Sequence, residues 1–548
     1  MKYEEVKKAD MVLFGNAVFT AKEEKPIKGG IAIRGNKILD VGSEYEMESY
    51  IGHRTQVYRF ENGLIMPGFH DSHVHMIMGS LSQDSVNLHD ASSEEEAAEM
   101  VYQFAKSRSN DPWILGFSWY HVFWKNKVLP HRSSLDRLIP DRPVFLLNFE
   151  GHGAWINSKA MEICNINRNT PDPPFGEIAR DENGEPTGYL YETAMGLVTK
   201  YAYDIPDDRQ REVVKSFLAK AARLGVTSIC DMQPFVGVDI GSLNVYREFE
   251  TNGELTVRLH IATSLNGDMV RARYLKENYC SDKLMHSGFK EFLDGVATTY
   301  TAFMLGPYSD KPYSCGSPLI SPEIIKNRLV EADREGFRVR LHACGDGAIR
   351  LGLDCVEAAR NANGTKDIRH TIEHIENIHS DDIKRFAQLG VIASMQPEHI
   401  TITDIFAENP YPIRLGSERE RLTWAMKTLM QNGAPMAFGS DYPVVDLDPM
   451  PGVYRAVTRL HNDGEPEGGW NPQERLTMAE TLRAYTLGSA YAMYRENELG
   501  TLEKGKFADI VVLDRNLFEI VHEEIRDTKV RLTIMDGKVV FEQNSQEY

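Results

Sequence analysis

Two histidines separated by one residue are the part of this sequence best suited to chemistry. His73 and His75 follow an apolar run at residues 64–66 and the turn signal Pro67-Gly68. In an extended strand, side chains at i and i+2 point to the same side, so both imidazoles can reach one ion. Imidazole is the commonest protein ligand for zinc and similar metals. A pair of surface or core-edge histidines is the alternative, and this spacing alone leaves it open.

The bulk composition excludes several classes of partner. The 548 residues are 42% hydrophobic and 26% charged, which is typical of a globular protein with a large core. The formal net charge of -19 repels phosphate backbones and anionic membrane surfaces. We therefore expect a small-molecule substrate and neither a nucleic-acid nor a membrane partner.

The cellular location of the protein is predicted from three features that the sequence lacks. The first ten residues are charged rather than apolar, and no apolar stretch approaches the roughly 20 residues that span a bilayer. The six cysteines are scattered without a C-x-x-C motif, as expected for reduced thiols. These features predict a cytoplasmic protein. The sequence does not decide the oligomeric state, and a homodimer is kept as a hypothesis.

Both ends of the chain are rich in β-type patterns. Short alternating runs fill residues 9–60, with a hairpin signal at residues 34–37, and the same texture returns at 506–514 and 530–542. This arrangement predicts a small β-sandwich domain built from residues 1–66 and 497–548. A large domain of residues 67–496 would lie between its two halves.

The centre of the chain alternates strand-like and helical patterns, which is typical of βα units around a parallel sheet. Eight candidate strands suggest an α/β fold with a (β/α)8 TIM-like barrel. They lie at residues 63–69, 225–232, 257–263, 289–295, 338–343, 368–374, 391–396 and 435–441.

An insertion is expected after the first barrel strand, because about 150 residues separate that strand from the second. We place it at about 108–205, over the C-terminal face of the barrel, where it would shape a substrate pocket. Its aromatic residues would either line that pocket or form a core of the insertion itself: Trp119, Tyr120, Trp124 and Trp155.

Polar side chains occur in or at the ends of several candidate strands. Barrel enzymes collect their catalytic groups at the C-terminal ends of the strands, so these side chains are predicted to converge on one site. Each by itself fits a buried polar group, but the whole set is hard to explain by burial. The set is His73, His75, Lys290, His342, His374 and Asp441.

The motifs that carry these residues resemble those of the amidohydrolase superfamily, and more narrowly the branch that includes N-substituted formamide deformylases. They are P-G-F-H-D-S-H-V-H, L-H-A-C-G-D, T-I-E-H, F-G-S-D-Y-P and L-G-T-L-E-K-G-K-F-A-D-I-V-V-L-D, together with G-H-G-A-W-I-N-S-K-A and R-D-E-N-G-E-P-T-G-Y-L in the insertion. The resemblance covers nearly the whole chain.

The resemblance implies a centre of one or two divalent metal ions, with zinc as the expected metal. His73, His75 and Asp441 would bind the first ion, and His342 and His374 the second. Lys290 would bridge them if CO2 carboxylates its amine, because a plain ammonium would repel the ions. Its neighbour Glu291 is a rival carboxylate but points to the opposite face of the strand.

The implied reaction is hydrolysis of a C–N bond in an amide, formamide or cyclic amide. Metal coordination lowers the pKa of a bound water from 15.7 towards about 7 and so provides hydroxide at neutral pH. Asp441 would take the proton of that water and deliver it to the departing nitrogen, and His152 would donate to the substrate oxygen. Asp71 fits either a supporting partner of the histidine pair or a turn residue, and Cys344 is predicted to pack.

Two other interpretations are weaker. Deaminases of this fold use a glutamate three residues after the fifth-strand histidine, and here that position is Gly345, followed by Asp346. A non-catalytic relative that serves as an assembly module would be expected to lose ligands, and this sequence lacks none of them.

Overall fold

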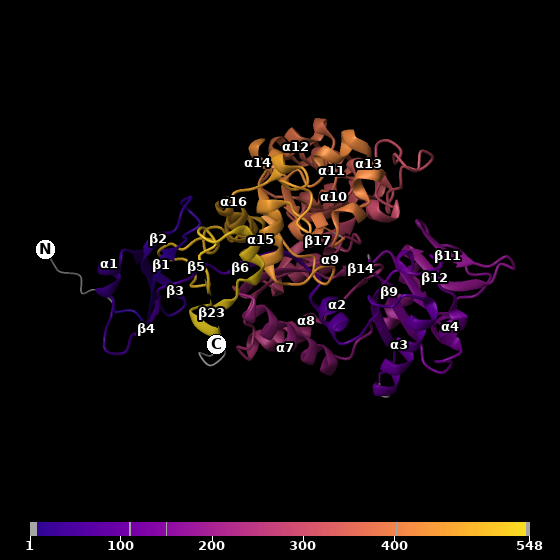
Figure 1. Cartoon of the computed structure of the whole chain (residues 1–548), viewed down its shortest axis with the longest axis horizontal. Coiled ribbons are helices and arrows are strands. Elements are labelled where there is room, and N and C mark those ends of the chain that lie inside the picture. Colours follow the sequence, from indigo (N-terminus) through magenta and orange to yellow (C-terminus); the bar gives the residue numbers. More distant parts are fainter. Residues whose placement is uncertain (1–7, 109–110, 150, 402, 544–548) are drawn as a thin grey trace.

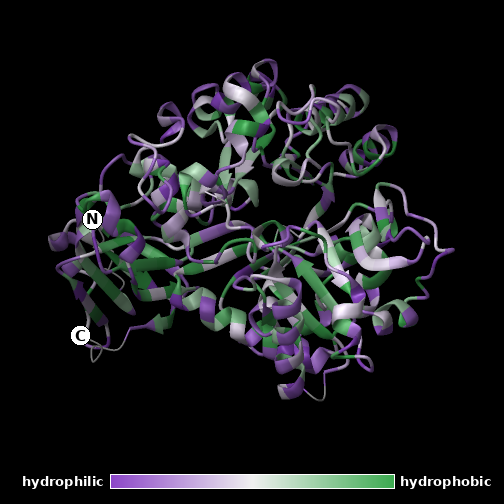
Figure 2. Ribbon diagram, turned by 45° about the vertical axis from the view of Figure 1, so that its right-hand side comes forward, coloured by the Kyte–Doolittle hydropathy of each residue, from purple (hydrophilic) through white to green (hydrophobic). Residues whose placement is uncertain are grey.

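The computed structural model describes residues 8–108, 111–149, 151–401 and 403–543. The three large sheets follow one another along the long axis of the molecule (Figure 1): a sheet near the two termini, a central barrel, and a sheet at the opposite end. Coloured by hydropathy (Figure 2), the strands are mostly hydrophobic, while hydrophilic residues are frequent on the surrounding helices and loops. No helix in the described ranges is both long enough and apolar enough to cross a membrane.

The central sheet is the predicted (β/α)8 barrel. Its eight strands are all parallel and pair in chain order, and a bridge between Val74 and Tyr442 joins the first strand to the residues after the last. The strands are β6 (Phe69–Val74), β13 (Val226–Met232), β16 (Arg258–Ser264), β17 (Leu284–Phe292), β18 (Val339–Ala343), β19 (Thr371–His374), β20 (Ile392–Met395) and β21 (Met436–Phe438). The fold class expected from the sequence is therefore confirmed.

Helices alternate with these strands and bury one apolar stripe each. In α7 (Asp207–Arg223) the buried side chains include Val213, Phe217 and Ala221, spaced by one helical turn. The later helices are α8 (Leu243–Thr251), α9 (Met269–Asn278), α10 (Pro322–Arg334), α11 (Asp346–Asn363), α12 (Ile383–Leu389) and α14 (Met426–Gln431). Because each connection returns to the same end of the barrel, the C-terminal ends of the eight strands gather on one face.

The terminal sheet contains strands from both ends of the chain. Its strands are β1 (Met11–Val18), β2 (Ile27–Arg34), β3 (Lys37–Gly42), β4 (Gln56–Phe60), β5 (Leu64–Pro67), β22 (Ile510–Leu513), β23 (Val530–Met535) and β24 (Lys538–Glu542). They form a single hydrogen-bonded sheet, because β1 pairs with β4 along its first half and with β5 at Val18.

One strand assignment made from the sequence is wrong. The run at residues 63–69 was expected to open the barrel, but β5 pairs with β1 and β22 of the terminal sheet, and the barrel begins at Phe69. Both segments are fully buried, but β5 is apolar throughout whereas β6 carries four polar residues between Phe69 and Val74. Periodicity cannot assign such a strand to one of two sheets, since that choice depends on its pairing partner.

The third sheet lies within the stretch between β6 and β13. Its strands are β7 (Val86–Asn87), β8 (Ile114–Trp119), β9 (Val144–Asn148), β10 (Gly153–Ile156), β11 (Gly176–Arg180) and β12 (Pro186–Glu192). The sheet thus begins at Val86, before the expected start of the insertion near residue 108. The sequence does not reveal this earlier start, because the amphipathic helix α3 (Glu94–Ser107) resembles an ordinary barrel helix. Trp119, Trp124 and Trp155 are buried together in its core, which confirms a packing role for these three aromatics.

Candidate metal centre

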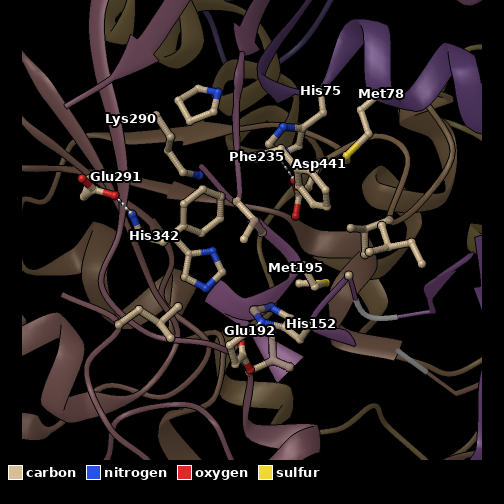
Figure 3. Close-up of a pocket in the computed structure, with 18 of the residues that line it drawn as sticks. His75, Met78, His152, Glu192, Met195, Phe235, Lys290, Glu291, His342 and Asp441 are labelled. Atoms are coloured by element: carbon tan, nitrogen blue, oxygen red, sulfur yellow. Dashed lines mark hydrogen bonds and ion pairs between the residues drawn. The ribbon is translucent and has the colours of Figure 1, made fainter. Parts of the chain in front are cut away.

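A cavity of about 800 Å³ opens at the C-terminal ends of the barrel strands, where the third sheet contributes to its wall. Figure 3 shows His75, Lys290, His342 and Asp441 around this cavity, with His152 facing them. His374 also lines it, whereas His73 is fully buried just behind. The structure therefore brings all of the predicted site residues to one place.

Asp441 lies between three of the predicted histidines. Its Oδ1 atom is 3.3 Å from Nε2 of His73 and 3.4 Å from Nε2 of His75, and its Oδ2 atom is 3.9 Å from Nδ1 of His374. The two carboxylate oxygens thus face different imidazoles. This is a geometry in which one carboxylate can contact two neighbouring cation positions.

His73 is held in one orientation by a buried chain of charges. Its Nδ1 atom donates to Oε2 of Glu373 at 2.8 Å, and Oε1 of Glu373 accepts from Arg340 at 2.8 Å. Glu373 and Arg340 are fully buried. Donation from Nδ1 leaves Nε2 without a proton, facing Asp441 and Lys290. This is how a carboxylate fixes the tautomer of a metal-binding histidine.

Lys290 points into the same centre. Its Nζ atom is 3.1 Å from Nε2 of His73, and burial lowers the pKa of the amine. A neutral amine is the form that reacts with CO2, and carboxylation of Lys290 stays a prediction. Glu291, the rival carboxylate, lies on the other side of the strand, with Oε2 3.6 Å from Arg328.

His342 and His374 are neighbours, with ring centroids 4.3 Å apart, but their ligand atoms face different groups. The Nε2 atom of His342 is 3.4 Å from the carbonyl oxygen of Gly295 and 3.3 Å from Sγ of Cys344. The two rings lie side by side, and the binding of one ion by both histidines stays a prediction. Cys344 contacts the site through its thiol, in addition to the packing predicted for it.

His399 is a site residue that the sequence reasoning missed. It lies in the short helical turn Pro397–Thr401 after β20, and its ligand atom falls within 4.8 Å of those of His374 and Asp441. The signal was present, because His399 follows the seventh candidate strand closely, where the barrel collects its functional groups. The segment Q-P-E-H gives no spacing motif that singles it out.

The backbone is held in unusual conformations at the centre. His374 and Asp441 have φ angles of 75° and 62°, in the left-handed region that residues other than glycine rarely adopt. A Cβ atom on Gly439 would lie 2.6 Å from the backbone nitrogen of His73, so only glycine permits this approach of β6 to the end of β21. Asp71 accepts backbone N–H bonds from His73 and Ser440, which identifies it as a support between these strands.

The protonation states suit a divalent cation. Burial lowers the pKa of His73 to about 4, and burial likewise holds the pKa values of His342 and His374 well below their usual range. Burial opposes ionisation of Asp441, but the surrounding imidazoles hold its pKa well below the usual value. Metal ligands must be neutral imidazoles and ionised carboxylates, and these groups meet that requirement.

Orphaned nitrogens provide the structural test of this fit. Within the described ranges, the Nε2 atoms of His374 and His399 are buried without a hydrogen-bond partner. Buried polar atoms are rarely left in this state unless a ligand or water completes them. Histidine nitrogens and a carboxylate also suit zinc and similar metals. The residues present fit a divalent metal ion.

His152 approaches the centre from the third sheet. Its Nδ1 atom is 2.8 Å from Oε2 of Glu192, and its ring centroid is 6.2 Å from that of His342. The pair joins the residue just before β10 to the last residue of β12, and Glu192 adopts a positive φ of 46°. His152 is therefore positioned across the cavity from the metal-compatible residues.

Comparison with known proteins agrees with this geometry. The chain is 32% identical over 97% of its length to Protein LONG AFTER FAR-RED 3 of Arabidopsis thaliana, covering 92% of that protein. It is 25% identical over 97% of its length to N-substituted formamide deformylase of Arthrobacter pascens, covering 98% of that protein. The crystal structure of an uncharacterized metal-dependent hydrolase from Pyrococcus horikoshii OT3 superposes with a TM-score of 0.76 at 25% identity, covering 94% of this chain and 99% of that one. The amidohydrolase family model matches residues 59–541, and the chain accordingly belongs to the amidohydrolase family of metal-dependent hydrolases.

Proposed function

We propose that this chain hydrolyses the C–N bond of a small amide, and that a formamide is the first substrate to test. The observation that carries the proposal is the position of Asp441, whose two oxygens face His73, His75 and His374 at the edge of an 800 Å³ cavity. The similarity to a protein named N-substituted formamide deformylase supports the choice of substrate.

A divalent ion held by His73, His75 and Asp441, with zinc as the expected metal, would polarise the carbonyl and make a water molecule acidic. His342 and His374, together with His399 and the same Asp441, would hold a second ion, and a carbamate on Lys290 would bridge the two ions. Two ions with the carbamate, or one ion without it, are the two forms of this proposal.

Asp441 is proposed as the proton carrier. The attacking water forms a new C–O bond and gives its proton to the carboxylate, which passes it to the nitrogen as the C–N bond breaks. For a formamide the products are formate and an amine. The imidazoles around Asp441 lower its pKa, so the carboxylate is ionised and able to accept this proton.

His152 is proposed to bind the substrate oxygen. The bond between Nδ1 of His152 and Oε2 of Glu192 orients the imidazole over the cavity that both residues line. Charge that develops on the substrate oxygen is then stabilised from the side opposite the metal ligands.

A deaminase is less well supported by the site. The carboxylate of Asp346, which follows the position expected for a deaminase glutamate, accepts the backbone N–H of Leu305 at 2.8 Å at the start of α11. It therefore serves the helix terminus rather than a proton transfer at the centre.

The test is hydrolysis by protein loaded with zinc, manganese or iron. Formamides, N-acyl amines and cyclic amides are supplied, and the released amine is measured. We expect Asp441→Asn to lose at least about 100-fold in turnover, the order of a general acid–base contribution. The control is Asp446→Asn, an exposed carboxylate paired with Lys220. Retained turnover in Asp441→Asn excludes this proton carrier, and absence of metal binding by the wild type would favour a non-catalytic role.

A further inference from the structure

The cavity extends beyond the metal-compatible residues into a set of charged side chains. This set, called the arginine lobe below, contains two arginine–carboxylate ion pairs and lies over the ends of β16 and β17. All of its members line the cavity: Asp239, Ser264, Asn266, Arg271, Glu291 and Arg328. Figure 3 shows Glu291 on the far side of Lys290 from Asp441, so the lobe faces a part of the substrate remote from the scissile bond.

Two guanidinium groups enter the lobe from neighbouring helices. Arg271 is on α9 and Arg328 is on α10, and their side chains are 46% and 33% exposed. These exposures leave both groups accessible from the cavity, in contrast to the buried Arg340 near His73. A guanidinium presents its N–H groups as a planar fork that matches a carboxylate.

Each arginine is held by one edge only. Nη1 of Arg328 donates to the carbonyl of Leu265 at 3.0 Å and lies 3.6 Å from Glu291, while Nη1 of Arg271 is 3.3 Å from Asp239. In the part of the chain that the structure describes, Nε and Nη2 of both arginines have no protein acceptor. These two atoms form the side-on edge that binds a carboxylate through two parallel hydrogen bonds.

The acidic residues of the lobe hold the arginines in place. Asp239 accepts the backbone N–H of Ser264 at 2.9 Å in addition to its ion pair with Arg271, and Glu291 accepts the backbone N–H of Phe292 at 3.1 Å. Their carboxylates are thus occupied by the protein. The free donor edges of the arginines are the groups left to meet a ligand.

We propose that the arginine lobe binds a carboxylate of the substrate. The preferred substrates would then be amides that carry a carboxylate away from the scissile C–N bond, such as N-formyl-ω-amino acids. This inference rests on the proposed function, because it assigns the remote part of a substrate whose amide is hydrolysed at Asp441. Arg271 and Arg328 act in it as binding and specificity residues.

The experiment compares matched substrates that differ only in the carboxylate. N-formyl-ω-amino acids of increasing length are paired with N-alkylformamides of the same chain length, and kcat/KM is measured for each with metal-loaded protein. We expect Arg328→Gln and Arg271→Gln each to lower kcat/KM for the best acid by about tenfold or more, the usual effect of losing a hydrogen bond to a charged group. The value for the neutral partner should not change.

Two controls remove a surface arginine from the same helices. Arg273→Gln on α9 breaks an exposed ion pair with Glu335, and Arg334→Gln on α10 breaks one with Glu331. Neither residue lines the cavity in the described part of the chain, so both variants should keep the wild-type preference. Equal losses for acid and neutral substrates, or no preference for the acid in the wild type, would overturn the proposal.

Binding without turnover separates this proposal from the proposed function. Isothermal titration of 6-formamidohexanoate and N-pentylformamide into the Asp441→Asn protein should show tighter binding of the acid, lost in Asp441→Asn/Arg328→Gln. If the acid binds in this way but the wild type hydrolyses no formamide, the lobe assignment stands and the reaction assignment fails. If formamides are hydrolysed but the acid has no advantage in binding, the lobe assignment fails alone.

Discussion

Replacing Glu373 with Gln tests whether the charge chain behind the centre both stabilises the fold and prepares the metal ligand. Glu373 is fully buried and bonds His73 and Arg340 at 2.8 Å each. Gln keeps the size of the side chain but removes the negative charge. The buried guanidinium of Arg340 then loses its anionic partner, and Nδ1 of His73 loses the acceptor that fixes its tautomer.

The size of the effect follows from the pKa of Glu373. Burial alone would raise this pKa, but His73, Arg340 and Lys290 lower it from 4.5 to about 2. At about 1.4 kcal/mol for each pKa unit, the ionised carboxylate stabilises the folded state by about 3 kcal/mol. Loss of one partner of a buried ion pair costs a similar amount, about 3–5 kcal/mol.

The sign of the pH dependence follows from the same shift. Because the folded-state pKa is below the unfolded value, the stabilisation is complete above pH 4.5 and is lost as the pH falls from 4.5 towards 2. The difference between wild type and Glu373→Gln should therefore be largest at neutral pH and disappear at the acid end of this window.

The assay is urea unfolding of the metal-free proteins, followed by metal titration. We expect Glu373→Gln to unfold at a lower urea concentration at neutral pH and to bind zinc about 10- to 100-fold more weakly, as when other supporting carboxylates are removed. The control is Glu335→Gln, whose ion pair with Arg273 is exposed and is worth at most about 1 kcal/mol. Equal unfolding midpoints together with equal zinc affinity would refute the assigned role of Glu373.

Three further predictions follow from other parts of the structure. Lys290→Ala should lower metal content and activity together, with partial rescue of both by added short-chain carboxylic acids; metal content unchanged by elemental analysis would assign the bridge to another group. Asp509→Asn breaks the bidentate pair of Asp509 with the fully buried Arg258, whose two bonds are 2.7 and 3.0 Å long. We expect the variant to lose about 3–5 kcal/mol of unfolding free energy in urea. An unfolding midpoint equal to that of the wild type would show that this pair does not stabilise the junction of the terminal sheet with the barrel. Burial lowers the pKa of His286 from 6.5 to about 4, so its neutral form stabilises the fold above pH 6.5 and this stabilisation falls as the pH drops towards 4. Between pH 7 and pH 4.5, the melting temperature of His286→Gln should accordingly fall less than that of the wild type, as measured by differential scanning calorimetry. Equal decreases in the two proteins would contradict the assignment.

The sequence by itself was sufficient for the barrel and for the convergence of the site. His73 and His75 at i and i+2, and the polar residues at the ends of later strands, predict a common location because all strands of a parallel barrel end on one face. This inference needs no knowledge of side-chain packing. It therefore holds even where an expected strand is displaced by several residues, as at the start of the barrel.

Only the tertiary structure decided which groups face one another. Pairing partners assigned β5 to the terminal sheet, and the turn after β20 brought His399 to Asp441. The pairing of Glu192 with His152 likewise joins residues 40 positions apart in the chain. Hydrogen bonds and ion pairs act over a few ångströms between side chains far apart in sequence, and no periodicity along the chain records that distance. The order of the strands in the sequence thus predicts where the metal-compatible residues gather, whereas their supporting contacts and the arginine lobe are visible only in the folded chain.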